Sequence, residues 1–188
     1  MRFSTEADDV PAIDRTKTTP LLTASRDAAA TAKARGSALE SYIAELFSQL
    51  PGLRVSARNS LNAAGSQEID IAFWNDKDLN GLYFIVDNCF LVESKNTAQP
   101  TSAAEIREFT TKLRDRGRRF GIFIAANGIT GARGHLRQAR DAVSRALRDG
   151  IELLVFTIAE LEALGTTDDF VRLVQDKIGL LFATESSI

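Results

Sequence analysis

The chain has 188 residues, 44% of them hydrophobic, and a formal net charge of −2. This length favours one domain with a substantial core, and the absence of an overall basic character means that any nucleic-acid contact must use a local patch. A single cysteine excludes a disulfide framework and a cysteine-cluster zinc site. Because no leader-like start and no long uncharged apolar run is present, we expect a soluble, cytoplasmic protein without membrane contact.

The first 22 residues are rich in Thr, Ser, Asp and Ala, and Pro11 and Pro20 interrupt any periodicity. We expect residues 1–22 to be a flexible or loosely docked arm, with a partner-binding or swapping segment as the alternative, and residues 23–188 to form one domain. An alanine-rich helix is expected from Arg26, and after Gly36 it becomes amphipathic through positions 39, 43, 46, 47 and 50.

Glu40 in that helix has two interpretations. Ser37 and Glu40 have the spacing of a capping box, in which the glutamate satisfies backbone donors at a helix start. Alternatively, Glu40 is an acidic residue directed at a functional site.

Two predicted strands carry charges in unusual places. In residues 68–74 the hydrophobic residues alternate with Glu68, Asp70 and Ala72, which puts Asp70 in mid-strand, where aspartate is depleted. In residues 90–96, Glu93 and Lys95 share one face of an apolar strand, roughly 7 Å apart. Ionised groups beside an apolar strand need a partner or a ligand, although a solvent-facing charge remains an alternative for Asp70.

The remaining elements alternate between helix and strand. Capping boxes at Ser102 and Thr157 begin two helices, and residues 120–126 and 151–156 are apolar runs typical of strands covered on both faces. Further helices are expected up to about Arg148 and over residues 170–182. This order predicts an α/β protein with a central mixed sheet flanked by helices on both faces.

If the strands of Asp70 and Glu93 are near neighbours, two carboxylates and the Lys95 ammonium converge. Crowded carboxylates repel unless a proton or cation lies between them, and an all-oxygen ligand set suits a hard ion such as Mg²⁺. A lysine beside that ion can orient a water or stabilise charge on a phosphate. The three residues therefore indicate phosphodiester hydrolysis.

Asp70 followed after a long gap by Glu93-Ser-Lys95 resembles the active-site signature of the PD-(D/E)XK nuclease superfamily, and the Glu40 helix is similar to the helix that precedes its core strands. The later segments 93–96, 105–109, 121–124 and 127–131 resemble the Mrr-like restriction-endonuclease branch, and the similarity spans about residues 36–164. Ile69 stands in place of the superfamily's proline, and Asn96 stands where a glutamine often follows the lysine.

The resemblance implies a restriction-endonuclease-like three-layer fold and a set of site roles. Asp70 and Glu93 would bind Mg²⁺, for which Mn²⁺ is expected to substitute, and the backbone carbonyl of Ser94 would add a ligand. Lys95 would position the attacking water, and Glu40 would contact the metal through water, a role compatible with capping.

Substrate contacts are less well specified by the sequence. Because a phosphate backbone needs only local positive charge, we expect nucleic-acid contacts from Asn96 and from the basic cluster Arg114, Arg116, Arg118 and Arg119, with the arginines of residues 133–148 as the alternative. His135 is expected on a helix surface, and Cys89 is expected to be a small buried hydrophobe.

The resulting hypothesis is a Mg²⁺-dependent DNA endonuclease of restriction or phage-defence type, acting as a homodimer because a duplex has two strands. A specificity or defence partner protein is a further expectation, since no separate DNA-reading domain is apparent. The alternatives are a nuclease of the same fold that acts on RNA or in repair, and a non-cleaving binding or scaffold module.

Overall fold

The computed structural model describes residues 10–85, 87–129 and 133–188. The elements of these residues are α1 (Arg15–Ser25), α2 (Ala32–Phe47), β1 (Leu53–Leu61), β2 (Glu68–Asn75), β3 (Cys89–Lys95), α3 (Ala103–Asp115), β4 (Phe120–Ala125), α4 (Arg133–Arg148), β5 (Glu152–Thr157), α5 (Ile158–Glu162) and α6 (Thr167–Thr184). The α/β class expected from the sequence is confirmed.

The five strands form one sheet in the order β1-β2-β3-β4-β5. β1, β2 and β3 pair antiparallel, whereas β3, β4 and β5 pair parallel. The predicted mixed sheet is therefore confirmed, and the change from antiparallel to parallel pairing occurs at β3.

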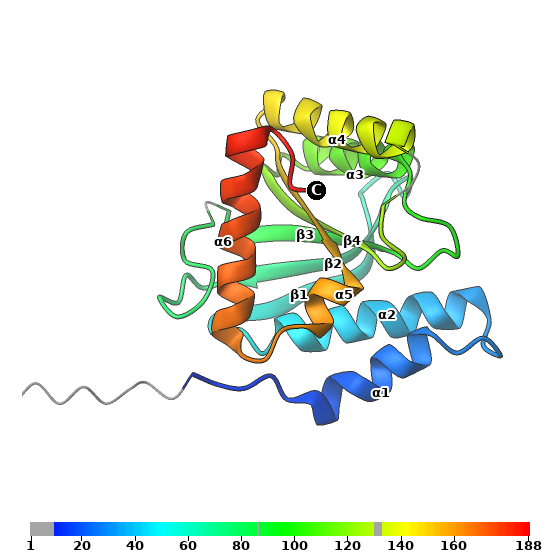
Figure 1. The fold of residues 1–188 in the computed structure, drawn as a ribbon, viewed down its shortest axis with the longest axis vertical. Helices are drawn as coiled ribbons and strands as arrows, with labels where there is room; N and C mark the ends of the chain where they lie inside the picture. Colours follow the sequence, from blue (N-terminus) through cyan, green and yellow to red (C-terminus); the bar gives the residue numbers. More distant parts are fainter. Residues whose placement is uncertain (1–9, 86, 130–132) are drawn as a thin grey trace, which may run out of the picture.

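Helices cover both faces of the sheet (Figure 1). α3 and α4 lie together on one face, as expected for right-handed crossovers between neighbouring parallel strands, and Phe109 of α3 packs on Phe123 of β4. On the other face, Phe47 of α2 contacts Phe73 of β2 and Phe170 of α6 at ring-centroid distances of 5.4 and 4.6 Å. The alternation along β3 thus separates an α2 side from an α3 side.

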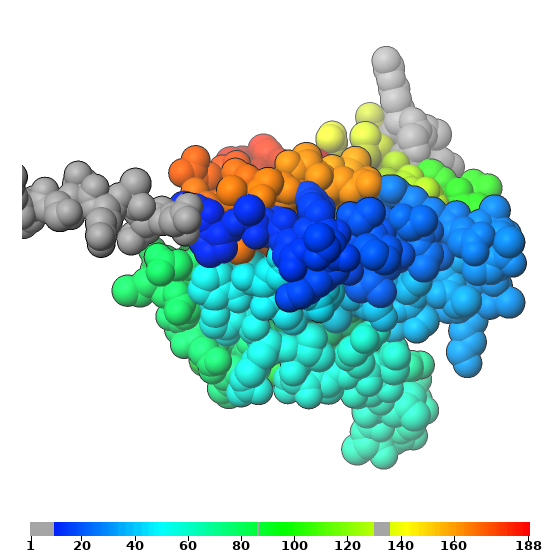
Figure 2. Space-filling view, turned by 90° about the horizontal axis from the view of Figure 1, so that it is seen from below, coloured from blue at the N-terminus to red at the C-terminus, as the bar shows by residue number. Residues whose placement is uncertain are grey.

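The N-terminal segment differs from the flexible or loosely docked arm expected over residues 1–22. Residues 15–25 form α1, which begins at the N-cap Asp14 and contains Pro20. Ile13 is buried, and its N–H donates to the Gly165 carbonyl at 2.9 Å. Figure 2 shows blue α1 against the orange residues around α5, where Arg26 pairs with Glu162. The expectation of an arm is wrong for residues 10–22, because tertiary contacts fix them; residues 1–9 lie outside the described residues.

The helix expected from Arg26 begins later, and the capping interpretation of Glu40 is wrong. α2 begins at Ala32 with Thr31 as its N-cap and continues through Gly36, so Glu40 lies in the third turn and caps nothing. The capping boxes at Ser102 and Thr157 are confirmed, with side chains of Glu105 and Glu160 completing them.

The segment after α6 returns to the β5 edge. The Ser187 hydroxyl accepts from the Val155 N–H at 3.1 Å and donates to the Leu153 carbonyl at 2.8 Å. The Ser187 carbonyl in turn accepts from Lys177.

In the described part of the chain, none of the helices combines the length and apolar character needed to span a bilayer.

Candidate active site

Asp70 and Glu93 meet where β2 and β3 separate. The last regular pair between these strands is Ile71 with Val92, and the next residue along each strand is Asp70 and Glu93. Beyond this pair, the Asp70 side chain rather than its backbone bonds to β3. Its Oδ2 accepts from the Ser94 N–H at 2.7 Å and from the Ser94 hydroxyl at 3.0 Å. The two acids therefore lie side by side on one face of the sheet, as alternation along both strands requires.

Glu93 is the most enclosed member of the site, with 1% of its surface exposed. Its Oε1 accepts from Lys95 Nζ at 3.0 Å and from Lys112 Nζ at 2.8 Å. Its Oε2 is buried and has no hydrogen-bond partner among the described residues. A buried carboxylate oxygen without a donor is costly, so this atom faces a position that a donor or a cation would stabilise.

Glu40 reaches the same region from α2. Its Oε2 is the second buried carboxylate oxygen without a hydrogen-bond partner in the described part of the chain, although Arg58 Nη2 lies 3.9 Å away. Burial raises the pKa of Glu40, and the charges of Glu68 and Glu93 act in the same direction, against the lowering effects of Asn59 and Arg58. Glu40 thus lies near Asp70 and Glu93, as the second of its two interpretations predicted. These three residues are called the acidic cluster below.

The titration of Asp70 also reflects this crowding. Burial and the Glu93 charge raise the pKa of Asp70 to about 6, with a smaller contribution from Glu40, while the Ser94 hydrogen bonds oppose the shift. Burial alone would lower the pKa of Lys95, but the charge and hydrogen bond of Glu93 raise it above its ordinary value. The predicted convergence of Asp70, Glu93 and Lys95 is thus what the structure contains.

The donor set fits a hard divalent cation. In the described residues, no three or more His, Cys, Asp or Glu side chains already form a metal-binding group, but Mg²⁺ in proteins is typically held by only one or two carboxylates and keeps several waters. The Glu40 and Glu93 oxygens that have no hydrogen-bond donor among the described residues supply acceptors. Ser94 adds a third, because a strand residue carries its N–H and carbonyl on the same edge, and the Ser94 N–H points at Asp70.

The predicted nucleic-acid contacts are mostly engaged within the protein. Both amide hydrogens of Asn96 are donated, to the Ser25 carbonyl at 2.9 Å and the Arg35 carbonyl at 3.0 Å, so this side chain ties β3 to α1 and α2. Arg114 pairs with Asp149, and Arg116 bonds to the side chain and carbonyl of Gln67.

Arg118 and Arg119 lie far along the sheet from the acidic cluster. They precede β4, whose Gly121 pairs with Leu91, whereas Lys95 pairs with Ala125 at the other end. The structure therefore does not bring these two arginines to the site, and their contact with nucleic acid stays a prediction.

Cys89 is half-buried, whereas the side chains of Arg133 and His135 lie outside the described residues.

Lys112 is the site residue that sequence reasoning missed. It precedes the basic cluster of residues 114–119 in the sequence, yet its side chain is only 10% exposed and bonds to Glu93. The signal was its position: Lys112 directly precedes Leu113 on the stripe formed by Ile106 and Phe109, all three of which are buried. A lysine at the edge of a buried stripe requires an anionic partner.

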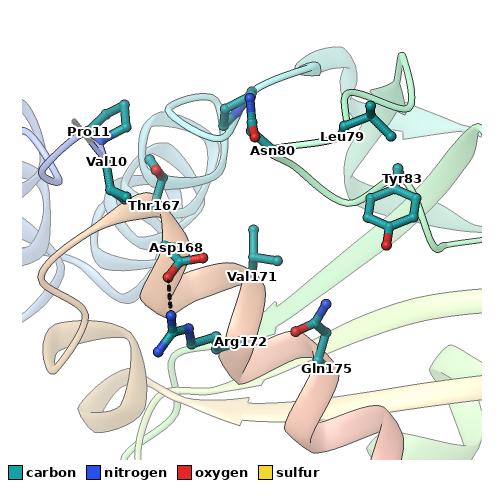
Figure 3. A pocket seen from close by; sticks show the side chains of 11 residues that line it. Val10, Pro11, Leu79, Asn80, Tyr83, Thr167, Asp168, Val171, Arg172 and Gln175 are labelled. Atoms are coloured by element: carbon teal, nitrogen blue, oxygen red, sulfur yellow. Dashed lines mark ion pairs between the residues drawn. The ribbon is translucent and has the colours of Figure 1, made fainter. Parts of the chain in front are cut away.

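A pocket of about 530 Å³ lies apart from this site. Leu79 and Tyr83 from the loop after β2 face Val171 of α6 across it, and an Asp168–Arg172 ion pair lies at its edge (Figure 3). The loop follows Asn75 at the far end of β2 from Asp70, so the pocket shares no residue with the acidic cluster.

Comparison of the sequence with protein-family models and with curated proteins finds no match.

Proposed function

We propose that this chain is a Mg²⁺-dependent endonuclease that hydrolyses DNA phosphodiester bonds, with the restriction-endonuclease-like fold of the PD-(D/E)XK superfamily and its Mrr-like branch. One observation carries the proposal: Asp70, Glu93 and Lys95 occupy one face of two adjacent strands, and Glu93 Oε2 is buried there without a hydrogen-bond partner in the described part of the chain. The order of a helix, antiparallel strands and then alternating helices and strands supports the same assignment.

The metal would be held by Asp70, Glu93 and the Ser94 carbonyl, with Glu40 acting through water. When bound, Mg²⁺ supplies positive charge at the phosphate and favours ionisation of a water. The chain's own acids must be ionised to hold a cation. In the metal-free protein, where its pKa is about 6, Asp70 is mostly ionised at pH 7.5 and mostly protonated at pH 5. In this proposal Mg²⁺ must displace a proton from Asp70 at pH 5 and therefore binds more weakly there than at pH 7.5.

Lys95 is the group best placed to act on the substrate. Its side chain is 27% exposed, and its ammonium lies 3.0 Å from Glu93 Oε1. An ammonium there can orient a water toward the phosphate or offset the charge that develops on its oxygens. In the proposal, two copies of the chain cut the two strands of a duplex, in restriction or phage defence, and a partner protein contributes sequence specificity.

Incubation of the protein with supercoiled plasmid and Mg²⁺ tests the proposal. Asp70→Asn and Lys95→Ala are compared with two controls at exposed ion pairs, Asp141→Asn and Lys17→Ala. We expect nicked and linear products from the wild type and both controls, none in EDTA, and a loss of at least about 100-fold in the two site variants. Cutting that persists in Asp70→Asn would refute the site.

Two other results would redirect the function. Cleavage of RNA but not of plasmid would support the RNA-directed alternative. An inactive wild type that still binds nucleic acid would support a non-cleaving module.

A further inference from the structure

Two lysines share a single oxygen of Glu93. Lys112 from α3 and Lys95 from β3 both donate to Oε1, at 2.8 and 3.0 Å. Their surroundings differ: the Lys112 side chain is 10% exposed and the Lys95 side chain 27%. Lys112 also has Glu108 at 3.8 Å on its solvent side.

One buried carboxylate needs one counter-ion, and a second ammonium at the same oxygen adds repulsion between like charges. An ammonium in the less solvated position interacts more strongly with Glu93 and is harder to withdraw. Lys112 occupies that position. Lys95, which is nearer to solvent, can leave Glu93 while the carboxylate keeps a partner.

We propose that Lys112 is a positioning residue, the fixed counter-ion of Glu93, whose presence frees Lys95 to act at the substrate. Without Lys112, Lys95 is the only ammonium among the described residues that bonds to Glu93, and moving it would leave a buried charge unpaired. Lys112 also bonds to Oε1, whereas Oε2 is buried without a hydrogen-bond partner among the described residues. The consequence for turnover rests on the proposed nuclease function, whereas the counter-ion role does not.

The counter-ion role is tested without substrate or metal. Urea unfolding in EDTA compares Lys112→Met with Lys95→Met, and Lys17→Met serves as the exposed control. We expect the unfolding midpoint to fall clearly for Lys112→Met, less for Lys95→Met and hardly for Lys17→Met. A midpoint that falls more for Lys95→Met would overturn the assignment of Lys112 as the fixed partner.

The effect on turnover is measured with plasmid and Mg²⁺ at a temperature where every variant is folded by circular dichroism. We expect Lys112→Met to lower kcat about 10- to 100-fold, the range seen for residues that orient metal ligands, with KM unchanged. Lys112→Arg keeps the charge and should recover most of the rate. A folded Lys112→Met protein with the wild-type kcat, or with a change in KM alone, would overturn the inference.

The two proposals fail in different ways. If the wild type cuts and Lys112→Met cuts equally well, the nuclease function stands and the role of Lys112 falls. If the wild type cuts nothing, the nuclease function falls, and the order of the urea midpoints still decides which lysine is the fixed counter-ion.

Discussion

Replacement of Asp70 by asparagine should stabilise the protein at neutral pH while abolishing its proposed activity. The pKa of Asp70 is raised from 3.8 to about 6 in the fold. Since one pKa unit corresponds to about 1.4 kcal/mol, the folded state disfavours the ionised carboxyl by about 3 kcal/mol. Asparagine removes this cost, and its oxygen can still accept the Ser94 hydrogen bond.

The stabilisation should depend on pH in a defined direction. Below pH 3.8 the carboxyl is protonated in both the folded and the unfolded chain, so Asp70 carries no ionisation cost. Between pH 3.8 and 6 the unfolded chain releases its proton first, and the wild type loses stability as the pH rises. Above pH 6 the cost is complete. Because the pKa of about 6 already includes the opposing hydrogen bonds from Ser94, we expect up to about 3 kcal/mol of net stabilisation.

Urea unfolding in EDTA at pH 4 and pH 7.5 measures this difference for the wild type and Asp70→Asn. Asp141→Asn, at an exposed ion pair with Arg145, is the matched control and should show no comparable gain. Equal stability of wild type and Asp70→Asn at pH 7.5, or a gain that is larger at pH 4, would refute the account of Asp70 as a crowded, buried acid.

Three further outcomes are expected. Mg²⁺ should raise the melting temperature of the wild type at pH 7.5, by the equivalent of about 2.7 kcal/mol at 100 times its dissociation constant, and should leave Asp70→Asn nearly unchanged; an equal rise in both would argue against Asp70 as a ligand. Asn96→Ala should lower the unfolding free energy by about 1 to 3 kcal/mol, because the Ser25 and Arg35 carbonyls lose their donors. A drop in DNA affinity, measured by fluorescence anisotropy, would show that Asn96 also contacts nucleic acid. Ser102→Ala should cost about 1 kcal/mol in urea unfolding through loss of the capping box, and a neutral result would count against that box.

The strands were predictable because their signal is local. Alternation along residues 68–74 and 90–96 determined which side chains share a face, and the pairing of β2 with β3 then placed Asp70 beside Glu93. The burial of residues 120–125 followed from an uninterrupted apolar run. Patterns with a period of two residues change face with every step, so they leave little freedom in interpretation.

Two of the errors concern contacts between distant segments. α1 contains Pro20 and has no strong amphipathic pattern, and the contacts that hold its segment involve residues near Gly165, which no local pattern reports. The capping interpretation of Glu40 rested on the spacing of Ser37 and Glu40 alone, whereas α2 has Thr31 as its N-cap and continues through Gly36. Lys112 was not predicted as a site residue, because its partner Glu93 lies on another element.

The Ser187 hydroxyl at β5 limits how two copies of the chain can associate. Edge strands are the usual place for one sheet to extend into another, through backbone groups left open. At β5 the Val155 N–H and the Leu153 carbonyl are already bonded to Ser187. A continuous sheet across two copies would therefore have to displace this serine or form at the opposite edge, along β1. Of the two edges, β1 is the one at which strand addition leaves the Ser187 contacts intact.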